Sequence, residues 1–257
     1  MTSAEPAAGR GSKPYFPTDA DAGIPLQQWE SLASGYAAVW AAENTREALF
    51  DAMRRRETYA TTGPRMSVRF FGGWDFAADD LDRPNYAHYA YQHGVPMGAH
   101  LPPKTNQRAH LPPNTSDAPR FLITAMKDPD GANLDRIQVI KGWVDVAGNK
   151  AEKVYNVAAS DGRKIRRNKV KAVGNTVDIE NATWRNSIGD DSLAVVWQDP
   201  DFNPQQRAFY YVRVLEIPTP RWTTVDAQVF GDALPEAAPA FGQERAYTSP
   251  IWYTPTP

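Results

Sequence analysis

The chain has 257 residues, with 28 Lys and Arg against 30 Asp and Glu, which gives a net charge of −2. With this near-neutral balance the chain has no general electrostatic attraction for nucleic acid or anionic lipid. We therefore expect neither nucleic acid nor a membrane surface as a partner. Cysteine is absent, which excludes disulfides, thiolate metal ligands and cysteine nucleophiles. We find no apolar stretch of 18 residues and no signal-peptide core. As written, the sequence predicts a cytoplasmic chain, although the compartment stays unknown.

Four prolines fall within residues 1–25, so this segment predicts a flexible leader. Residues 26–65 predict a helical unit. Asn44 and Glu47 form a capping pattern that predicts a helix over about 45–57. A weaker helix over 26–42 is interrupted by Ser34-Gly35, and a strand stays possible there.

From residue 66 the spacing at which apolar residues recur changes from about 3.6 residues, typical of a helix, to about 2 residues, typical of a strand. This change predicts a domain boundary at this point. The segment 66–257 predicts a mainly β, sandwich-like domain, because several short strands bury their apolar faces most simply as two packed sheets. Turns are predicted at 128–131 and at 147–149, the latter within a hairpin. The predicted strands cover about 66–70, 121–126, 136–146, 153–158, 192–197, 208–216 and 251–253.

Residues 94–119 form a Pro-rich loop that contains a ten-residue repeat. The sequence AHLPPKT at 99–105 recurs as AHLPPNT at 109–115. Pro-Pro pairs impose extended backbone without internal hydrogen bonds, so we expect a surface loop. A run of six cations within 163–171 is interpreted as a solvated arm, because it contains no aromatic residue to stack on bases.

No complete catalytic motif occurs, so the catalytic residues stay unknown. The turn formed by Thr61, Thr62, Gly63, Pro64 and Arg65 follows the predicted helix, and its amides and guanidinium are candidates for holding an anion or for lying at a domain junction.

The four histidines are the only soft metal ligands of the chain. Their spacing does not place two ligands one helical turn apart, so we expect no metal here, and His88, His93, His100 and His110 remain weak candidates. Three tryptophans outside the clearest strands, Trp74, Trp184 and Trp222, are weak candidates for stacking on a ligand.

Several blocks of the sequence resemble a bacterial family, the domain of unknown function 3604. The longest is ENTREALFDAMRRRETYATTGPRMSVRFFGGW at 43–74, and others are LDRIQVIKGWVD at 134–145, GNTVDIENATW at 174–184 and RAFYYVRVLEIPTPRW at 207–222. The resemblance covers about residues 24–257. It implies kinship with the PHP superfamily of metal-dependent hydrolases, whose motifs lie in an N-terminal barrel and whose full-length relatives use a divalent metal.

The resemblance therefore implies a C-terminal part of such a protein, with 26–65 as the remnant of the last barrel unit. We expect it to be inactive alone, to need no cofactor of its own, and to associate with a separate barrel chain. These residues do not identify a substrate. They also do not show whether the full-length relatives are exported. Two alternatives stay open: a stand-alone binding module, for example for carbohydrate, and a hydrolase that uses the cluster from His88 to His110.

Overall fold

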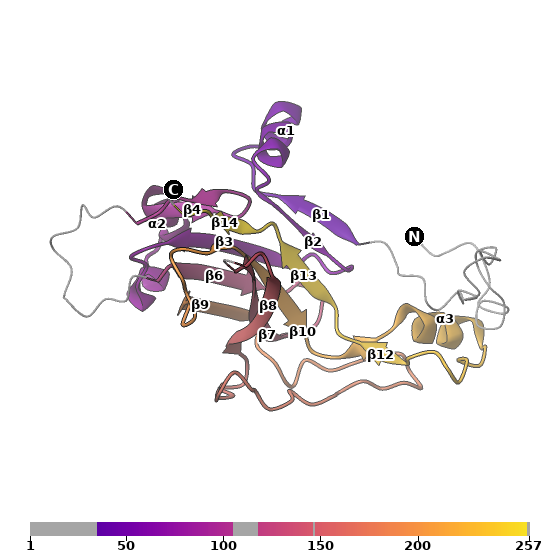
Figure 1. Cartoon of the computed structure of the whole chain (residues 1–257). Coiled ribbons are helices and arrows are strands. Elements are labelled where there is room, and N and C mark those ends of the chain that lie inside the picture. The colour runs from indigo at the N-terminus through magenta and orange to yellow at the C-terminus, as the bar shows by residue number, and fades with distance from the viewer. Residues whose placement is uncertain (1–34, 105–117, 146, 256–257) are drawn as a thin grey trace, which may run out of the picture.

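The computed structural model describes residues 35–104, 118–145 and 147–255, and shows a mainly β chain built on two large sheets (Figure 1). The prediction of a mainly β, sandwich-like domain is confirmed. The strands predicted at about 66–70, 121–126, 136–146, 153–158, 192–197, 208–216 and 251–253 are found, in this order, as β3 (Ser67–Gly73), β6 (Arg120–Met126), β7 (Leu134–Val144), β8 (Lys150–Ala159), β9 (Ser192–Gln198), β10 (Arg207–Glu216) and β14 (Ile251–Tyr253).

The larger sheet is organised around one long strand, β10 (Arg207–Glu216). β7 pairs with β10 along its whole length, and β8 then pairs with β7 as the predicted hairpin. On the other edge of β10, β13 and β14 pair with successive parts of the strand and continue the sheet to β2 and β5. The other strands are β1 (Tyr36–Val39), β2 (Thr58–Thr61), β5 (His100–Leu101), β7 (Leu134–Val144), β8 (Lys150–Ala159), β13 (Arg245–Thr248) and β14 (Ile251–Tyr253).

The smaller sheet has four strands in the order β4-β3-β6-β9, all antiparallel. They are β4 (Gly94–Pro96), β3 (Ser67–Gly73), β6 (Arg120–Met126) and β9 (Ser192–Gln198).

The main core lies between these two sheets. Val68 and Phe70 of β3 belong to the same buried cluster as Tyr210 and Val212 of β10. Alternate residues of each strand point to this interface, because successive side chains of a strand point to opposite faces. The period of two that the sequence shows from residue 66 is therefore the pattern of sheets that pack face to face.

The opposite face of the small sheet is covered by a helix that the sequence did not reveal. Phe71 and Leu122 point away from the main core and form a second cluster with Phe76 and Ala90. Ala90 belongs to α2 (Tyr86–His93), which follows a short 3₁₀ turn, η2 (Ala78–Asp82). The molecule thus has a third, partial layer beside its two sheets.

The segment 26–65 differs from its prediction. Its described part contains one helix, α1 (Arg46–Arg54), and its N-cap is Thr45 rather than Asn44, with the Thr45 hydroxyl accepting from the Ala48 amide at 3.3 Å. In the described part of 26–42, β1 is a strand, the alternative that the sequence leaves open, and β2 follows α1 as another strand of the large sheet. Pairing with β13 holds β2 in the sheet, pairing with β2 holds β1, and α1 stands out from the body between them (Figure 1).

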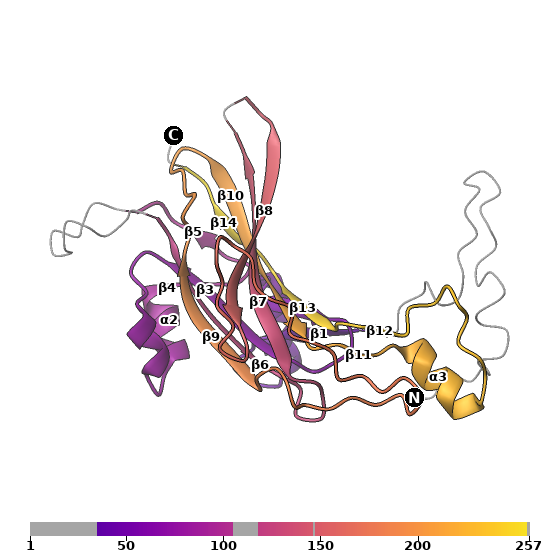
Figure 2. The ribbon, with the colours of Figure 1, turned by 90° about the horizontal axis from the view of Figure 1, so that it is seen from below.

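A second projection extends from the far end of the large sheet (Figure 2). It contains β11 (Thr219–Pro220), α3 (Trp222–Phe230) and β12 (Phe241–Gly242), with β11 and β12 paired. The loop 172–188 runs in the same direction in both views. We call the loop 172–188 and residues 219–242 together the arm.

The Pro-rich loop is described only at its ends. β4 and β5 occupy its first residues, and β5 adds a parallel strand to the edge of the large sheet beside β14. Residues 105–117, which hold the second copy of the repeat and His110, lie outside the described residues, as do the predicted leader 1–25 and residues 26–34.

Candidate functional site

The turn predicted as an anion site is surrounded by carboxylates. The amide of Arg65 donates to Asp128 Oδ2 at 2.6 Å, and its guanidinium pairs with Asp128 at 3.4 Å and with Asp130 at 3.2 Å. The hydroxyl of Thr62 donates to Glu244. Although burial raises the pKa of Asp128, the amides of Arg65 and Asp130 lower it below its ordinary value. The donors that would hold an anion are therefore engaged by the protein's own carboxylates.

Glu216, at the end of β10, is a buried carboxyl beside this turn. It is 1% exposed, and its Oε1 has no hydrogen-bond partner among the described residues. Burial, together with the charges of Glu244 and Asp128, raises its pKa to about 8. Sequence reasoning missed it, because an acidic residue at a strand end ordinarily indicates a solvent-exposed position.

The described histidines are spread over two elements. His88 and His93 lie on α2, where His88 Nε2 contacts Gln92 Nε2 at 3.0 Å and His93 Nδ1 contacts the carbonyl of Tyr89 at 2.9 Å. The ring of His93 also stacks on Tyr89 at 3.9 Å. His100 lies in β5, opposite Trp252.

Within residues 35–104, 118–145 and 147–255, no three His, Asp or Glu side chains are grouped closely enough to hold a metal ion. The donor set of the described residues thus does not fit the divalent metal that the resemblance implies for full-length relatives.

The three candidate tryptophans do not form one surface. The ring of Trp74 meets Phe202 and Tyr253 edge to face, and its Nε1 donates to the carbonyl of Pro102 at 3.0 Å. These contacts place Trp74 against the body near the C-terminal strand, whereas Trp222 begins α3 at the other end of the molecule (Figure 1).

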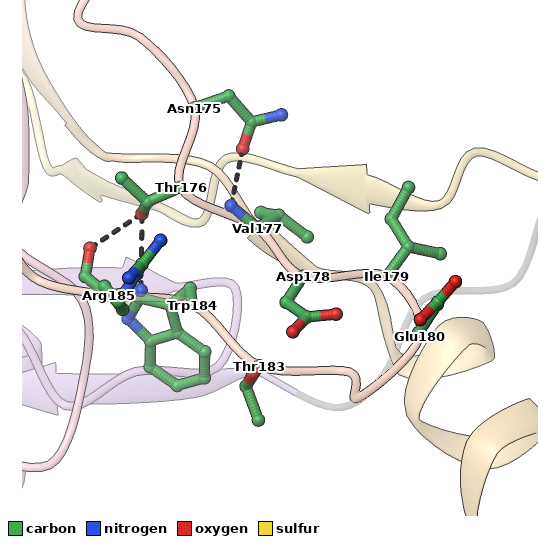
Figure 3. Close-up of a pocket in the computed structure, with 9 residues that line it drawn as sticks. All are labelled: Asn175, Thr176, Val177, Asp178, Ile179, Glu180, Thr183, Trp184 and Arg185. Atoms are coloured by element: carbon green, nitrogen blue, oxygen red, sulfur yellow. Dashed lines mark hydrogen bonds between the residues drawn. The ribbon is translucent and has the colours of Figure 1, made fainter.

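Trp184 lines a hollow of about 650 Å³ within the arm (Figure 3). The loop around it is closed on itself, since the hydroxyl of Thr176 donates to the carbonyl of Arg185 at 2.6 Å and Asp178 and Thr183 exchange backbone hydrogen bonds. Its other lining side chains include Asp178, Ile179 and Glu180. The hollow is formed by a single loop, so its shape depends on that loop alone.

A buried charged network lies in the main core. Lys141 is 2% exposed, and its Nζ lies 2.6 Å from Asp199 Oδ2 and 2.7 Å from the carbonyl of Asp201. Tyr210 donates to the same Asp199 oxygen at 2.7 Å, and both burial and this carboxylate raise the pKa of Tyr210. The groups satisfy one another, so we interpret the network as structural. A lysine at an inward position of the apolar run RIQVIKGWV is the signal that predicts it.

A second hollow, of about 640 Å³, opens on the large sheet where β7, β8, β10 and β14 lie side by side. Its lining includes the aromatic residues Trp143, Phe209 and Trp252, and its rim carries charged side chains. None of the tryptophans chosen from the sequence belongs to it.

The most unusual local feature is the orientation of α3. Thr223 and Thr224 are its buried residues, while Val225, Val229 and Phe230 are 40%, 62% and 43% exposed. A surface helix ordinarily buries its apolar stripe and exposes its polar side. The polarity of α3 is therefore reversed.

Other exposed apolar side chains lie near α3 in the arm and on α1. In the arm they are Ile179 and Phe241, and on α1 they are Phe50 and Met53, both more than half exposed. Both projections thus present apolar surface to solvent, a property typical of interfaces.

A family model described as "Protein of unknown function (DUF3604)" matches residues 9–255. The chain belongs to this family. The DUF3604 blocks identified in the sequence include β7, at 134–145, and the continuous run from β10 through β11 to the start of α3, at 207–222. The family pattern thus includes the central strand and the arm, as well as the hollow at 174–184.

Neither the curated proteins nor the solved structures contain a match to this DUF3604 chain. Among its described helices, none combines the length and apolar character needed to cross a membrane.

Proposed function

We propose that this DUF3604 chain is an accessory β-domain that docks onto a separate domain of the metal-dependent hydrolase type. The reversed polarity of α3 carries the proposal. A helix with Thr223 and Thr224 buried and Val225, Val229 and Phe230 exposed is stabilised best when another apolar surface covers its outer face.

The projection formed by α1 supports the same role. On α1, Ala52 is buried against the body while Phe50 and Met53 are each more than 50% exposed. Removing such side chains from water contributes about 25 cal/mol per Å² of apolar area, which is the main favourable term in association. Two apolar projections on one chain offer a bipartite contact surface.

The proposed partner follows from the sequence resemblance, which implies a PHP-like barrel that binds a divalent metal. In the complex, the barrel would supply the hydrolytic chemistry, with a metal-activated water acting on a phosphate, sulfate or ester. The chain described here would supply the covering surface and would be inactive by itself.

The test uses the metal-binding barrel of a full-length DUF3604 protein, produced as a separate polypeptide and mixed with this chain. Sedimentation velocity should show a 1:1 complex. The variant Val229→Asp places a charge on the exposed face of α3 and should abolish the complex. Met126→Asp is the matched control, because Met126 is 60% exposed at the end of β6 in the body, and it should leave the complex intact.

Three outcomes would contradict the proposal. The first is a mixture that sediments as two separate species, and the second is a complex that tolerates Val229→Asp. The third is a dimer of this chain alone that Val229→Asp disrupts, which would assign the face of α3 to self-association instead.

A further inference from the structure

The outer face of the large sheet carries a row of aromatic rings on neighbouring strands. Phe209 of β10 lies directly opposite Trp252 of β14, with ring centres 5.3 Å apart. Two residues along β10, Tyr211 lies nearly parallel to Phe209, with centres 6.4 Å apart and 14° between the planes. These three rings point away from the main core, because Ala208, Tyr210 and Val212 between them point into it.

A glycine allows this row to lie flat on the sheet. Gly142 of β7 is the partner of Phe209 on the side away from Trp252. A Cβ at Gly142 would lie 2.3 Å from the Phe209 ring, so the ring occupies the space that a side chain would take. The Phe209 ring thus lies over the Gly142 position on one side and beside the Trp252 ring on the other.

Two of these rings, Phe209 and Trp252, border the hollow of about 640 Å³, a volume within the range of small-ligand sites. Its rim carries Lys150, Glu152 and Arg207, all exposed. Within the part of the chain that the structure describes, none of these three forms an ion pair. The hollow thus combines flat apolar faces with free donors and a free acceptor.

We propose that this hollow binds a neutral saccharide, with a sugar ring stacked on Trp252 and Phe209. A sugar ring has an apolar C–H face that matches an aromatic face, and its hydroxyls both donate and accept hydrogen bonds. Lys150 and Arg207 donate to hydroxyl oxygens, and Glu152 accepts from a hydroxyl.

The mixed charge of the rim selects against charged ligands. A polyanion meets the carboxylate of Glu152, and a cation meets Lys150 and Arg207, so each gains less than a neutral ligand that can use all three groups. The site lies on the body and uses no residue of α3, so it is independent of the proposed docking surface.

Affinity electrophoresis of the full chain tests the proposal. The gels contain hydroxyethyl cellulose, xyloglucan, arabinoxylan, galactomannan, laminarin, dextran or amylopectin as neutral polysaccharides, and heparin or polygalacturonate as polyanions. The unmodified chain should be retarded by at least one neutral polysaccharide and not preferentially by the polyanions.

The variants locate the binding. Trp252→Ala should weaken retardation by about tenfold or more, equivalent to ~1.4 kcal/mol. Gly142→Ala should weaken it by a smaller factor, because the Phe209 ring must move while every aromatic residue is kept. Tyr36→Ala is the matched control, since Tyr36 is an exposed aromatic residue of β1 outside the hollow, and it should change nothing.

Circular dichroism of each variant confirms that it folds, and Trp252, at 37% exposed, is a position where substitution leaves the core unchanged. The proposal is overturned if no neutral polysaccharide retards the chain. It is also overturned if the polyanions bind more tightly than every neutral polysaccharide, or if folded Trp252→Ala and Tyr36→Ala behave alike.

Discussion

The sandwich body and the arm bury opposite kinds of side chain. In the body, the inward positions of β10 are apolar on both sides of Tyr210, and they meet the inward positions of β3 and β6 in one cluster. In the arm, α3 buries two threonines and exposes two valines and a phenylalanine. The body therefore buries its apolar side chains within this chain, whereas the arm leaves apolar side chains exposed, as a surface that contacts another molecule does.

The body and the projections also differ in the groups whose environment is unfavourable: buried charges in the body, and exposed apolar side chains on α1 and α3. Lys141 and Asp199 are enclosed within the body and held by Tyr210, so their desolvation is offset by contacts of this chain itself. The apolar groups of α1 and α3 have no such compensation within the described chain. Changes in the body should consequently alter stability, and changes in the arm should alter association.

The largest effect is expected from breaking the buried pair. Lys141→Met keeps the volume of the side chain but leaves Asp199 in the core without its cation. Removing one member of a buried pair destabilises a fold by about 3–5 kcal/mol, and we expect a loss in this range. Urea unfolding followed by tryptophan fluorescence measures it.

Two comparisons sharpen this prediction. Lys153→Met removes a cation from the pair with Asp201, in which both side chains are nearly half exposed, and should cost less than about 1 kcal/mol. The double change Lys141→Met with Asp199→Asn should be less harmful than Lys141→Met alone, because no uncompensated charge is left. Equal losses for Lys141→Met and Lys153→Met would refute the distinction.

A pH-dependent effect is expected from Glu216, which titrates within the fold. Its pKa is raised from 4.5 to about 8, so between these values the folded chain holds a proton that the unfolded chain releases. The stability contributed by the protonated carboxyl is complete below about pH 4.5 and declines as the pH rises through 8, with a slope of at most about 1.4 kcal/mol per pH unit.

Glu216→Gln replaces the carboxyl by a neutral group of the same shape and should flatten this decline. Thermal unfolding of both proteins from pH 5 to pH 8.5 makes the comparison, and Glu152→Gln serves as an exposed control. Parallel curves for the original chain and Glu216→Gln would show that the carboxyl does not titrate in this range.

The smallest effect on stability is expected in the arm. Val229→Ser changes a side chain that is 62% exposed, and it should shift the free energy of unfolding by no more than about 0.5 kcal/mol. The same change should lower the tendency of the chain to aggregate, which light scattering at increasing concentration detects. A loss of stability comparable to that of Lys141→Met would mean that α3 belongs to the core after all.

The sequence predicted the body well because its strands follow one simple rule. Val68 and Phe70 alternate with polar neighbours, and the turn at Ala147-Gly148-Asn149 has Gly148 at φ +84°, the conformation that its sequence favours. Prediction failed where pairing decided the structure. β2 is a strand because it pairs with β13, near the other end of the chain, and β1 is a strand because it pairs with β2.

The candidate sites also depend on contacts between distant parts of the chain, which the sequence does not reveal. Thr62 and Arg65 were chosen for their donors, but the acceptors that engage them, Glu244 and Asp128, come from distant parts of the chain. Trp252 lies in the predicted strand at 251–253, and no local signal distinguishes the two faces of a short strand. Its position beside Phe209 depends on the register of β14 against β10.

The sequence by itself determined the class of fold, the positions of most strands and the family, because alternation, turn residues and long blocks of residues are local properties. Only the tertiary structure decided which face of each strand is covered, that Lys141 and Glu216 are buried, and that α3 exposes its apolar side. Burial and electrostatic environment depend on which segments meet in space, and that information is distributed over the whole chain.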